Sequence, residues 1–287
     1  MLYSKNGMSV AEKAHPVIFI DGDQDASRGL NLAELWRHRE LLFFMTWRDI
    51  ALRYKQTALG GMWALIYPVM SVGVFTVFFG RIAQISSDGI PYALFSLSGL
   101  LLWIYFANTI SRCSSSLVGN AHMLNKVYFP RLLLPLSSVF PGFVDFAIAS
   151  SILVFGFFFY RITPPLSALV WCPLILLGTS LLALGVGMVL GAVNVRYRDI
   201  NNGIAFLLQM WMFATPVVYP ASLVQAKYRW LVGLNPMVGY VEAFRSALYR
   251  TPLDLELVWI SVAVTALSLV WGTRYFLKME KTFADVV

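Results

Sequence analysis

The sequence predicts an all-α polytopic membrane protein with about six transmembrane helices. Of its 287 residues, 58% are hydrophobic and only 13% are charged, whereas a soluble domain carries about 25% charged residues. Apolar runs of about 20 residues, the length of helix that crosses the hydrocarbon core of a bilayer, recur along the chain. Lys and Arg cluster between alternate pairs of these runs, which is typical of loops on the cytoplasmic side.

The chain is expected to have two parts. Residues 1–30 are a polar cytoplasmic extension, without the apolar run and cleavage site of a signal peptide. Residues 31–287 form the membrane domain. This domain is expected to begin with an amphipathic helix, because Asn31 can cap it and Glu34 occupies the third helical position. The helix lies either in the membrane interface or on an ordinary protein surface, and the nearby first span favours the interface.

The predicted spans differ in quality. They lie near residues 62–82, 92–110, 132–160, 169–193, 204–218 and 257–276. The third contains Pro135 and Pro141, so we expect it to kink or to start outside the membrane. The fifth is short and ends at Pro216.

The segment before the last span, Tyr219–Leu255, is unusually apolar for a loop. Gly233 and Pro236 interrupt it, and the pair Asn235-Pro236 is typical of a helix start. We expect two short helices that re-enter the membrane from the outer side. A loop lying on the outer surface is the alternative, since re-entrant backbone needs surrounding protein or water.

The distribution of cations predicts the orientation. With both termini in the cytoplasm, most of the 22 Lys and Arg residues lie on the cytoplasmic side. The exceptions are Arg81, Arg161, Lys227, Arg229, Arg245 and Arg250. The net charge of +7 is spread between apolar runs and forms no single basic patch, so no nucleic-acid partner is predicted.

Motifs for enzymatic chemistry are missing from the sequence. It contains no Gly-Lys pair and therefore no phosphate-binding P-loop, and it has neither H-E-x-x-H nor G-x-S-x-G. The three histidines are far apart, and Cys113 and Cys172 do not have the spacing of a metal site. A transporter, a channel or a membrane scaffold is therefore expected, with no catalytic residue, metal or cofactor on this chain.

Four pieces of the sequence carry a family resemblance. They are the run from Trp47 to Gly80 (WRDI, RYKQT, LGGMW), Asn125–Arg131 (NKVYFPR), Asn194–Ile200 (NVRYRDI) and Leu234–Pro236 (LNP). In this order and spacing the sequence resembles the permease subunits of type 2 ABC transporters, in the branch that exports bacterial polysaccharides such as O-antigens. The resemblance covers the chain from about Leu32 onward.

This resemblance implies a homodimeric permease that works with two copies of a separate ATP-binding subunit, on which ATP and magnesium bind. The substrate would be a lipid-linked polysaccharide that crosses the bacterial inner membrane through a channel at the dimer interface, among membrane lipids. Two alternatives remain at this point: an exporter of drugs or small lipids from the same superfamily, and a non-transporting membrane scaffold of a glycan synthase.

Two sets of polar residues receive possible roles. Arg48, Arg53 and Lys55 are placed to meet a pyrophosphate headgroup arriving from the cytoplasm, since arginine binds phosphate bidentately. The alternative is that they only set the topology. The connection Ser111–Arg131 is expected to hold a short helix, Ser116–Lys126, that couples to the ATPase, with a solvated loop as the alternative. Its candidate coupling residues are Ser116, Asn120, His122, Asn125 and Lys126.

Aromatic residues in the spans are candidates for lining a sugar path, although packing against lipid is the alternative for each. They are Phe75, Phe78, Phe79, Trp211, Phe213 and Tyr219, together with Trp103, Tyr105 and Phe106. Asp145 is the acidic residue deepest in a span, and it either relays protons or pairs with Arg or hydroxyl groups of another helix. Gly187 and Gly191 form a G-x-x-x-G step that permits close helix packing, within or between subunits.

Overall fold

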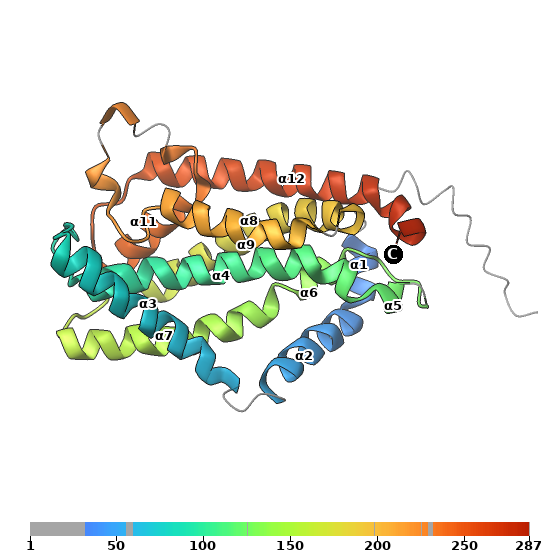
Figure 1. Ribbon diagram of the computed structural model, residues 1–287, viewed down its shortest axis with the longest axis horizontal. Coiled ribbons are helices and arrows are strands. Elements are labelled where there is room, and N and C mark those ends of the chain that lie inside the picture. Colours follow the sequence, from blue (N-terminus) through green and yellow to red (C-terminus); the bar gives the residue numbers. More distant parts are fainter. Residues whose placement is uncertain are drawn as a thin grey trace, which may run out of the picture. The chain divides into compact units, whose positions relative to one another are not determined.

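The computed structural model describes residues 32–55, 60–124, 126–197, 199–224, 226–228 and 232–286 (Figure 1). The chain divides into two units, Met1–Asn31 and Leu32–Val287. The polar extension and the expected cap at Asn31 lie outside the described residues. Within those residues every regular element is a helix, which confirms the all-α fold class.

The described part contains five helical segments that are long and apolar enough to cross a membrane. They are α3 with the π-helical turn η3 (Trp63–Phe75 and Thr76–Ile82), α4 (Tyr92–Gly119), α6 with α7 (Leu133–Ser137 and Phe140–Tyr160), α8 (Ala168–Arg196) and α12 (Leu255–Val286). The sixth expected span is α9 (Ile200–Ala214), a helix of 15 residues. At ~1.5 Å per residue it is about 22 Å long, shorter than the ~30 Å hydrocarbon core.

Two short helices precede the first span. α1 (Leu32–Arg37) and α2 (Arg39–Lys55) together replace the single amphipathic helix expected from the sequence. A single 3₁₀ turn, η2 (Gly60–Met62), then leads into α3. The expected interruption of the third span is confirmed, because α6 ends at Ser137 and α7 begins at Phe140. Pro141 lies in the first turn of α7, where proline is tolerated.

The fourth helix, α4, extends well beyond the apolar run that predicted it. It continues to Gly119, and of the described residues from there to Lys126 only the four of α5 (Ala121–Leu124) form a helix. The prediction of one short helix over Ser116–Lys126 was therefore wrong. The cause is visible in the serines: Ser116 Oγ donates to Cys113 O at 2.8 Å, and Ser114 and Ser115 bond to Ser111 O. These bonds satisfy the hydroxyl groups within the helix, so a polar sequence stays helical.

Small residues bring α4, α8 and α12 into close contact, and the three helices run side by side (Figure 1). A Cβ atom on Gly187 would collide with Cys113 of α4, and one on Gly191 would lie 3.1 Å from Cys113 O. On the other side of α8, a Cβ atom on Gly185 would lie 2.8 Å from the backbone of Ser268 in α12. The G-x-x-x-G step therefore packs helices within one chain.

We expect the replacement of Gly272 by alanine to destabilise the protein by about 2 kcal/mol, a typical cost of overpacking. Gly272 is buried in α12, and its added Cβ would collide with the backbone carbonyl of Gly185. The melting temperature in detergent measures the effect. Gly203→Ala is the matched control, because Gly203 is exposed in α9 with no neighbour within 4 Å. Equal melting temperatures for the two variants would contradict the close α8–α12 contact.

The segment before the last span holds one buried helix, α11 (Pro236–Tyr249), which packs against α4, α8 and α12. The expected helix start is confirmed, since the Asn235 side chain accepts a hydrogen bond from the Met237 backbone N at 3.1 Å. Ahead of α11 the structure describes two 3₁₀ turns, η4 (Ala221–Leu223) and η5 (Ala226–Tyr228). Residues 225 and 229–231 lie outside the described residues, so the first of the two expected helices stays a prediction.

Candidate functional site

A cavity of about 300 Å³ lies where α3, α4 and α7 meet the last turn of α2. Its polar wall contains Arg53, Arg112, Asp145 and Asn108. Its remaining wall is apolar and rich in aromatic rings, including Trp63, Tyr67, Trp103, Tyr105 and Phe146. The cavity therefore combines positive charge with flat apolar surfaces.

Asp145 is the centre of the polar wall, and its two carboxylate oxygens have different partners. Tyr54 Oη donates to Oδ1 at 2.6 Å. Oδ2 lies 2.9 Å from Arg53 Nη1 and 3.3 Å from both terminal nitrogens of Arg112. Of the two alternatives for this carboxylate, pairing with arginine and hydroxyl groups is what the structure contains. Two guanidinium groups therefore face this one carboxylate.

Close backbone packing brings these side chains together. A Cβ atom on Gly142 would lie 2.8 Å from the Tyr105 ring, so glycine lets α7 approach α4. Asp145 follows one helical turn later on the same face of α7 and thereby reaches Arg112. On the other side, Gly61 lies close to the Tyr54 ring, where an added Cβ would be 3.1 Å away. The chain entering α3 therefore covers the end of α2.

Burial raises the pKa of the Tyr54 hydroxyl to about 12, and its hydrogen bond to Asp145 adds to the rise. Tyr54 therefore stays protonated and donates to the carboxylate throughout the physiological range. In the unfolded chain the hydroxyl titrates near 10. Between pH 10 and 12 the unfolded state loses this proton while the folded state keeps it, so this contribution to stability is complete below pH 10 and declines above it.

We expect Tyr54→Phe to lower the free energy of unfolding at neutral pH by about 1.5–2 kcal/mol, since a hydrogen bond to a charged acceptor is lost. Because the variant lacks this hydroxyl, its free energy of unfolding should fall less between pH 10 and 12 than that of the wild type. Thermal unfolding measured across this range checks both effects. Tyr67→Phe is the control, because Tyr67 lines the same cavity but is exposed. A Tyr54 variant that behaves like the control would rule out the role of this hydrogen bond.

The three predicted headgroup residues do not converge. Arg53 lies in the cavity. Arg48 instead pairs with Asp49 at 2.8 Å and donates to Asn120 Oδ1 at 2.8 Å, which ties α2 to the end of α4. Lys55 is exposed at the last residue of α2. Sequence reasoning missed Arg112 and Tyr54 as partners, although a carboxylate inside a span already required a cation nearby.

The predicted aromatic residues fall into two groups. Phe78 and Phe213 are exposed on the helix surface. Phe75, Phe79, Trp211 and Tyr219 are partly buried against the core, where Trp103 and Phe106 form edge-to-face contacts with Trp211. The Trp211 indole also donates to Asn235 Oδ1 at 2.9 Å and so supports the start of α11. Tyr105 is buried and bonded to Ser180 at 2.6 Å.

The predicted coupling residues are distributed over three places. Ser116 is buried within α4, so its side chain is not exposed on the helix surface. Asn120 caps α4 and bonds to Arg48, whereas His122 lies in α5 and Lys126 is exposed after it. Asn125 lies outside the described residues. In the part of the chain that the structure describes, no group of His, Cys, Asp and Glu side chains is arranged to hold a metal ion.

Comparison with known proteins gives the family. Residues 40–249 match the ABC-2 type transporter family. The chain is 26% identical over 248 residues to the O-antigen export system permease protein RfbA of Klebsiella pneumoniae, which covers 86% of this chain and 95% of the relative. It is 27% identical over 257 residues to the protein of that name from Myxococcus xanthus, covering 88% and 98%.

A more distant relative is the polysialic acid transport protein KpsM of Escherichia coli, 23% identical over 209 residues, with 70% of this chain and 78% of the relative covered. The family resemblance expected from the sequence motifs is thereby confirmed. The chain belongs to the ABC-2 type transporter family, as one of its membrane permease subunits.

Proposed function

We propose that this chain is the membrane subunit of an ATP-driven exporter that moves a lipid-linked, O-antigen-like polysaccharide across the bacterial inner membrane. The names of its relatives support polysaccharide as the substrate class. Two copies of the chain form the channel, and two copies of a separate subunit bind ATP and magnesium. Both termini lie in the cytoplasm, in agreement with the distribution of Lys and Arg.

The cavity around Arg53 and Arg112 is the observation that carries this proposal. The diphosphate of a lipid-linked glycan carries several negative charges and planar sets of oxygens, which the guanidinium fork matches. Without substrate, Asp145 pairs with both arginines, and the diphosphate then competes with it for them. The exposed rings of Trp63 and Tyr67 provide apolar surface for the first sugar or the isoprenoid. Such flat surfaces let a polymer slide because they impose no fixed set of hydrogen bonds.

The geometry also suggests how ATP closure reaches the cavity. The ATPase docks at α5 and the exposed end of α4, near Asn120 and His122. From Asn120 the rigid helix α4 leads back to Arg112, a distance of about 12 Å at ~1.5 Å per residue. Since Arg48 joins Asn120 to α2, movement of the docked end shifts both arginine-bearing helices together. The affinity of Arg53 and Arg112 for the headgroup then changes with the nucleotide bound to the ATPase.

We expect Arg53→Gln to reduce export of the polysaccharide at least tenfold, because one charge-assisted phosphate contact is worth about 1.5–3 kcal/mol. Surface polysaccharide in a strain that depends on this gene measures the effect, together with the amount of inserted permease and of copurified ATPase. Arg37→Gln is the control, since Arg37 is an exposed cation in α1. Unchanged export by a normally inserted Arg53→Gln variant would reject the proposed headgroup site.

A further inference from the structure

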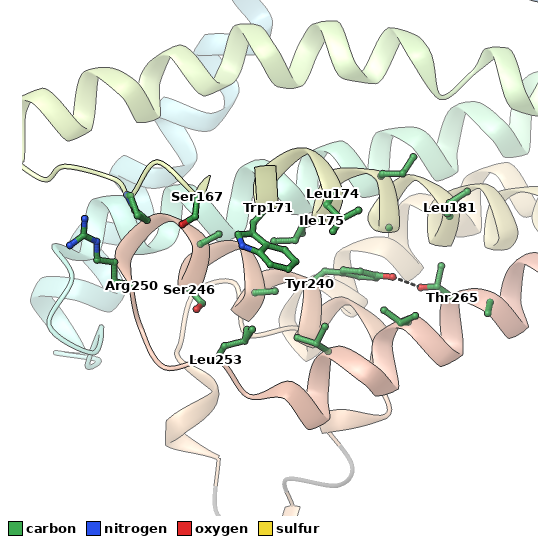
Figure 2. Close-up of a pocket in the computed structure, with 18 of the residues that line it drawn as sticks. Ser167, Trp171, Leu174, Ile175, Leu181, Tyr240, Ser246, Arg250, Leu253 and Thr265 are labelled. Carbon is green, nitrogen blue, oxygen red and sulfur yellow. Dashed lines mark hydrogen bonds between the residues drawn. The ribbon is translucent and has the colours of Figure 1, made fainter. Parts of the chain in front are cut away.

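A second, larger cavity of about 720 Å³ lies between α8, α11 and α12, and its walls are almost entirely apolar (Figure 2). Trp171, Leu174 and Leu181 of α8 form one wall. Val262 and Leu269 of α12 form the opposite wall. Because α8 and α12 are both long enough to span the membrane, this cavity lies at the depth of lipid chains.

The polar groups deep in the cavity already have partners. Tyr240 and Thr265 are hydrogen-bonded to each other, with their oxygens 2.8 Å apart (Figure 2). The wall residues Trp171, Leu174 and Val262 are about half exposed, so the cavity is open along its side. Water is a poor occupant of such a space, since an ordered water needs two to four polar partners. An apolar chain is therefore the occupant that the walls favour.

One end of the cavity carries a positive charge. Arg250 lies there beside Ser167, and Leu181 marks the far end (Figure 2). Arg250 is exposed and caps α11 in the left-handed conformation, with φ at 58°. No hydrogen bond joins its guanidinium group, or the Ser167 hydroxyl, to another described residue. This end therefore offers donors for an anion at the boundary of the apolar space.

The cavity is long enough for one acyl chain. From Ser167, which precedes α8, to Leu181 the chain rises about 21 Å at ~1.5 Å per residue, about two thirds of the ~30 Å hydrocarbon core. The charged end of the cavity suits the headgroup of a phospholipid, and the apolar part suits one of its acyl chains. The charge is complementary as well, since Arg250 is positive and a phosphate is negative.

We propose that this cavity binds an anionic phospholipid of the outer leaflet, with one acyl chain between α8 and α12 and the phosphate at Arg250. The bound chain fills the space beside α11 and so holds this helix against its neighbours. The inference depends on the orientation of the chain in the membrane, and it does not depend on which substrate is exported.

Photoactivatable phosphatidylglycerol, with the reactive group near the end of one acyl chain, tests the site in nanodiscs that contain the whole protein. Peptide mass spectrometry then locates the labelled residues. The expected result is labelling of α8 and α12 near Leu181 and Leu269, at the end opposite Arg250. Arg250→Gln should weaken labelling roughly fivefold, as one cation near a membrane surface is worth about 1 kcal/mol. A phosphatidylcholine probe should label less strongly than phosphatidylglycerol.

Two matched controls separate the site from general contact with lipid. Arg161→Gln removes another exposed arginine that caps a helix in the left-handed conformation, and it should leave labelling unchanged. Ala266→Trp fills the cavity and should abolish labelling, whereas Ala263→Trp changes an exposed α12 residue that does not line the cavity and should have no effect. Labelling that survives both Arg250→Gln and Ala266→Trp would overturn the proposal. A disulfide between two copies carrying Ala266→Cys would overturn it as well, because a second protein chain would then cover the cavity.

Discussion

Replacement of Arg245 by methionine is expected to destabilise the folded protein by about 4 kcal/mol, because it leaves several buried acceptors without a donor. Arg245 is almost completely buried in α11. Its guanidinium donates to the carbonyls of Pro216 at 2.7 Å, Val217 at 2.7 Å and Phe95 at 3.2 Å. These bonds join α11 to α4 and to the chain that follows α9. The melting temperature in detergent should fall by roughly 8 °C or more.

Two further variants sharpen this prediction. Arg245→Lys should recover only part of the loss, since an ammonium group cannot reach three separated carbonyls as the planar fork does. Gly99→Ala should resemble Arg245→Met, because the added Cβ would lie 2.7 Å from Arg245 Nη2. Arg161→Met is the exposed control. A melting temperature of Arg245→Met equal to that of this control would contradict the proposed connection.

Asp145→Ala is expected to cost about 3 kcal/mol, the lower end of the range for breaking a buried ion pair. The lower end applies because the Arg53 side chain is 41% exposed and partly solvated, whereas the Asp145 side chain is 12% exposed. The substitution leaves Arg112 and Arg53 facing each other without the carboxylate between them. Thermal unfolding of the purified protein should show a melting temperature about 6 °C lower.

A double-mutant cycle separates charge repulsion from loss of packing. Asp145→Asn keeps the size of the side chain, and Arg112→Gln removes one of the two facing positive charges. The double variant should therefore be more stable than Asp145→Asn alone. If the changes in unfolding free energy of the two single variants add up to that of the double variant, Asp145 and Arg112 are not coupled. That result would contradict the ion pair described in this cavity. A proton-relay role for Asp145 predicts a different result, a transport rate that depends on the pH gradient without ATP.

Much of the fold could be predicted because it depends on local patterns. Span length and polarity indicated the all-α membrane fold, and the Asn235-Pro236 pair indicated the start of α11. The end of α4 could not be placed, since the serines near residue 115 are polar by type but bond back to their own helix. Arg245 was assigned to the outer side from the predicted topology, and its burial was not foreseen because arginines are rarely buried.

The candidate site was only partly predictable. The charge of Arg53 and the position of Asp145 inside a span both indicated functional residues. Their convergence with Arg112 is a tertiary contact between residues far apart in the chain, and helical periodicity does not specify which faces meet. Arg48, so similar in sequence context, is instead paired with its neighbour Asp49 and with Asn120.

Binding of a polyprenyl diphosphate to the purified permease, measured by its effect on intrinsic tryptophan fluorescence, is the sharpest test of the arginine cavity. Trp63 and Trp103 line this cavity and should report the bound headgroup. The wild-type protein should bind the diphosphate more tightly than the monophosphate, and Arg53→Gln should weaken binding at least tenfold. Arg37→Gln should bind like the wild type. Equal affinity of all three proteins for the diphosphate would contradict its binding at Arg53 and Arg112.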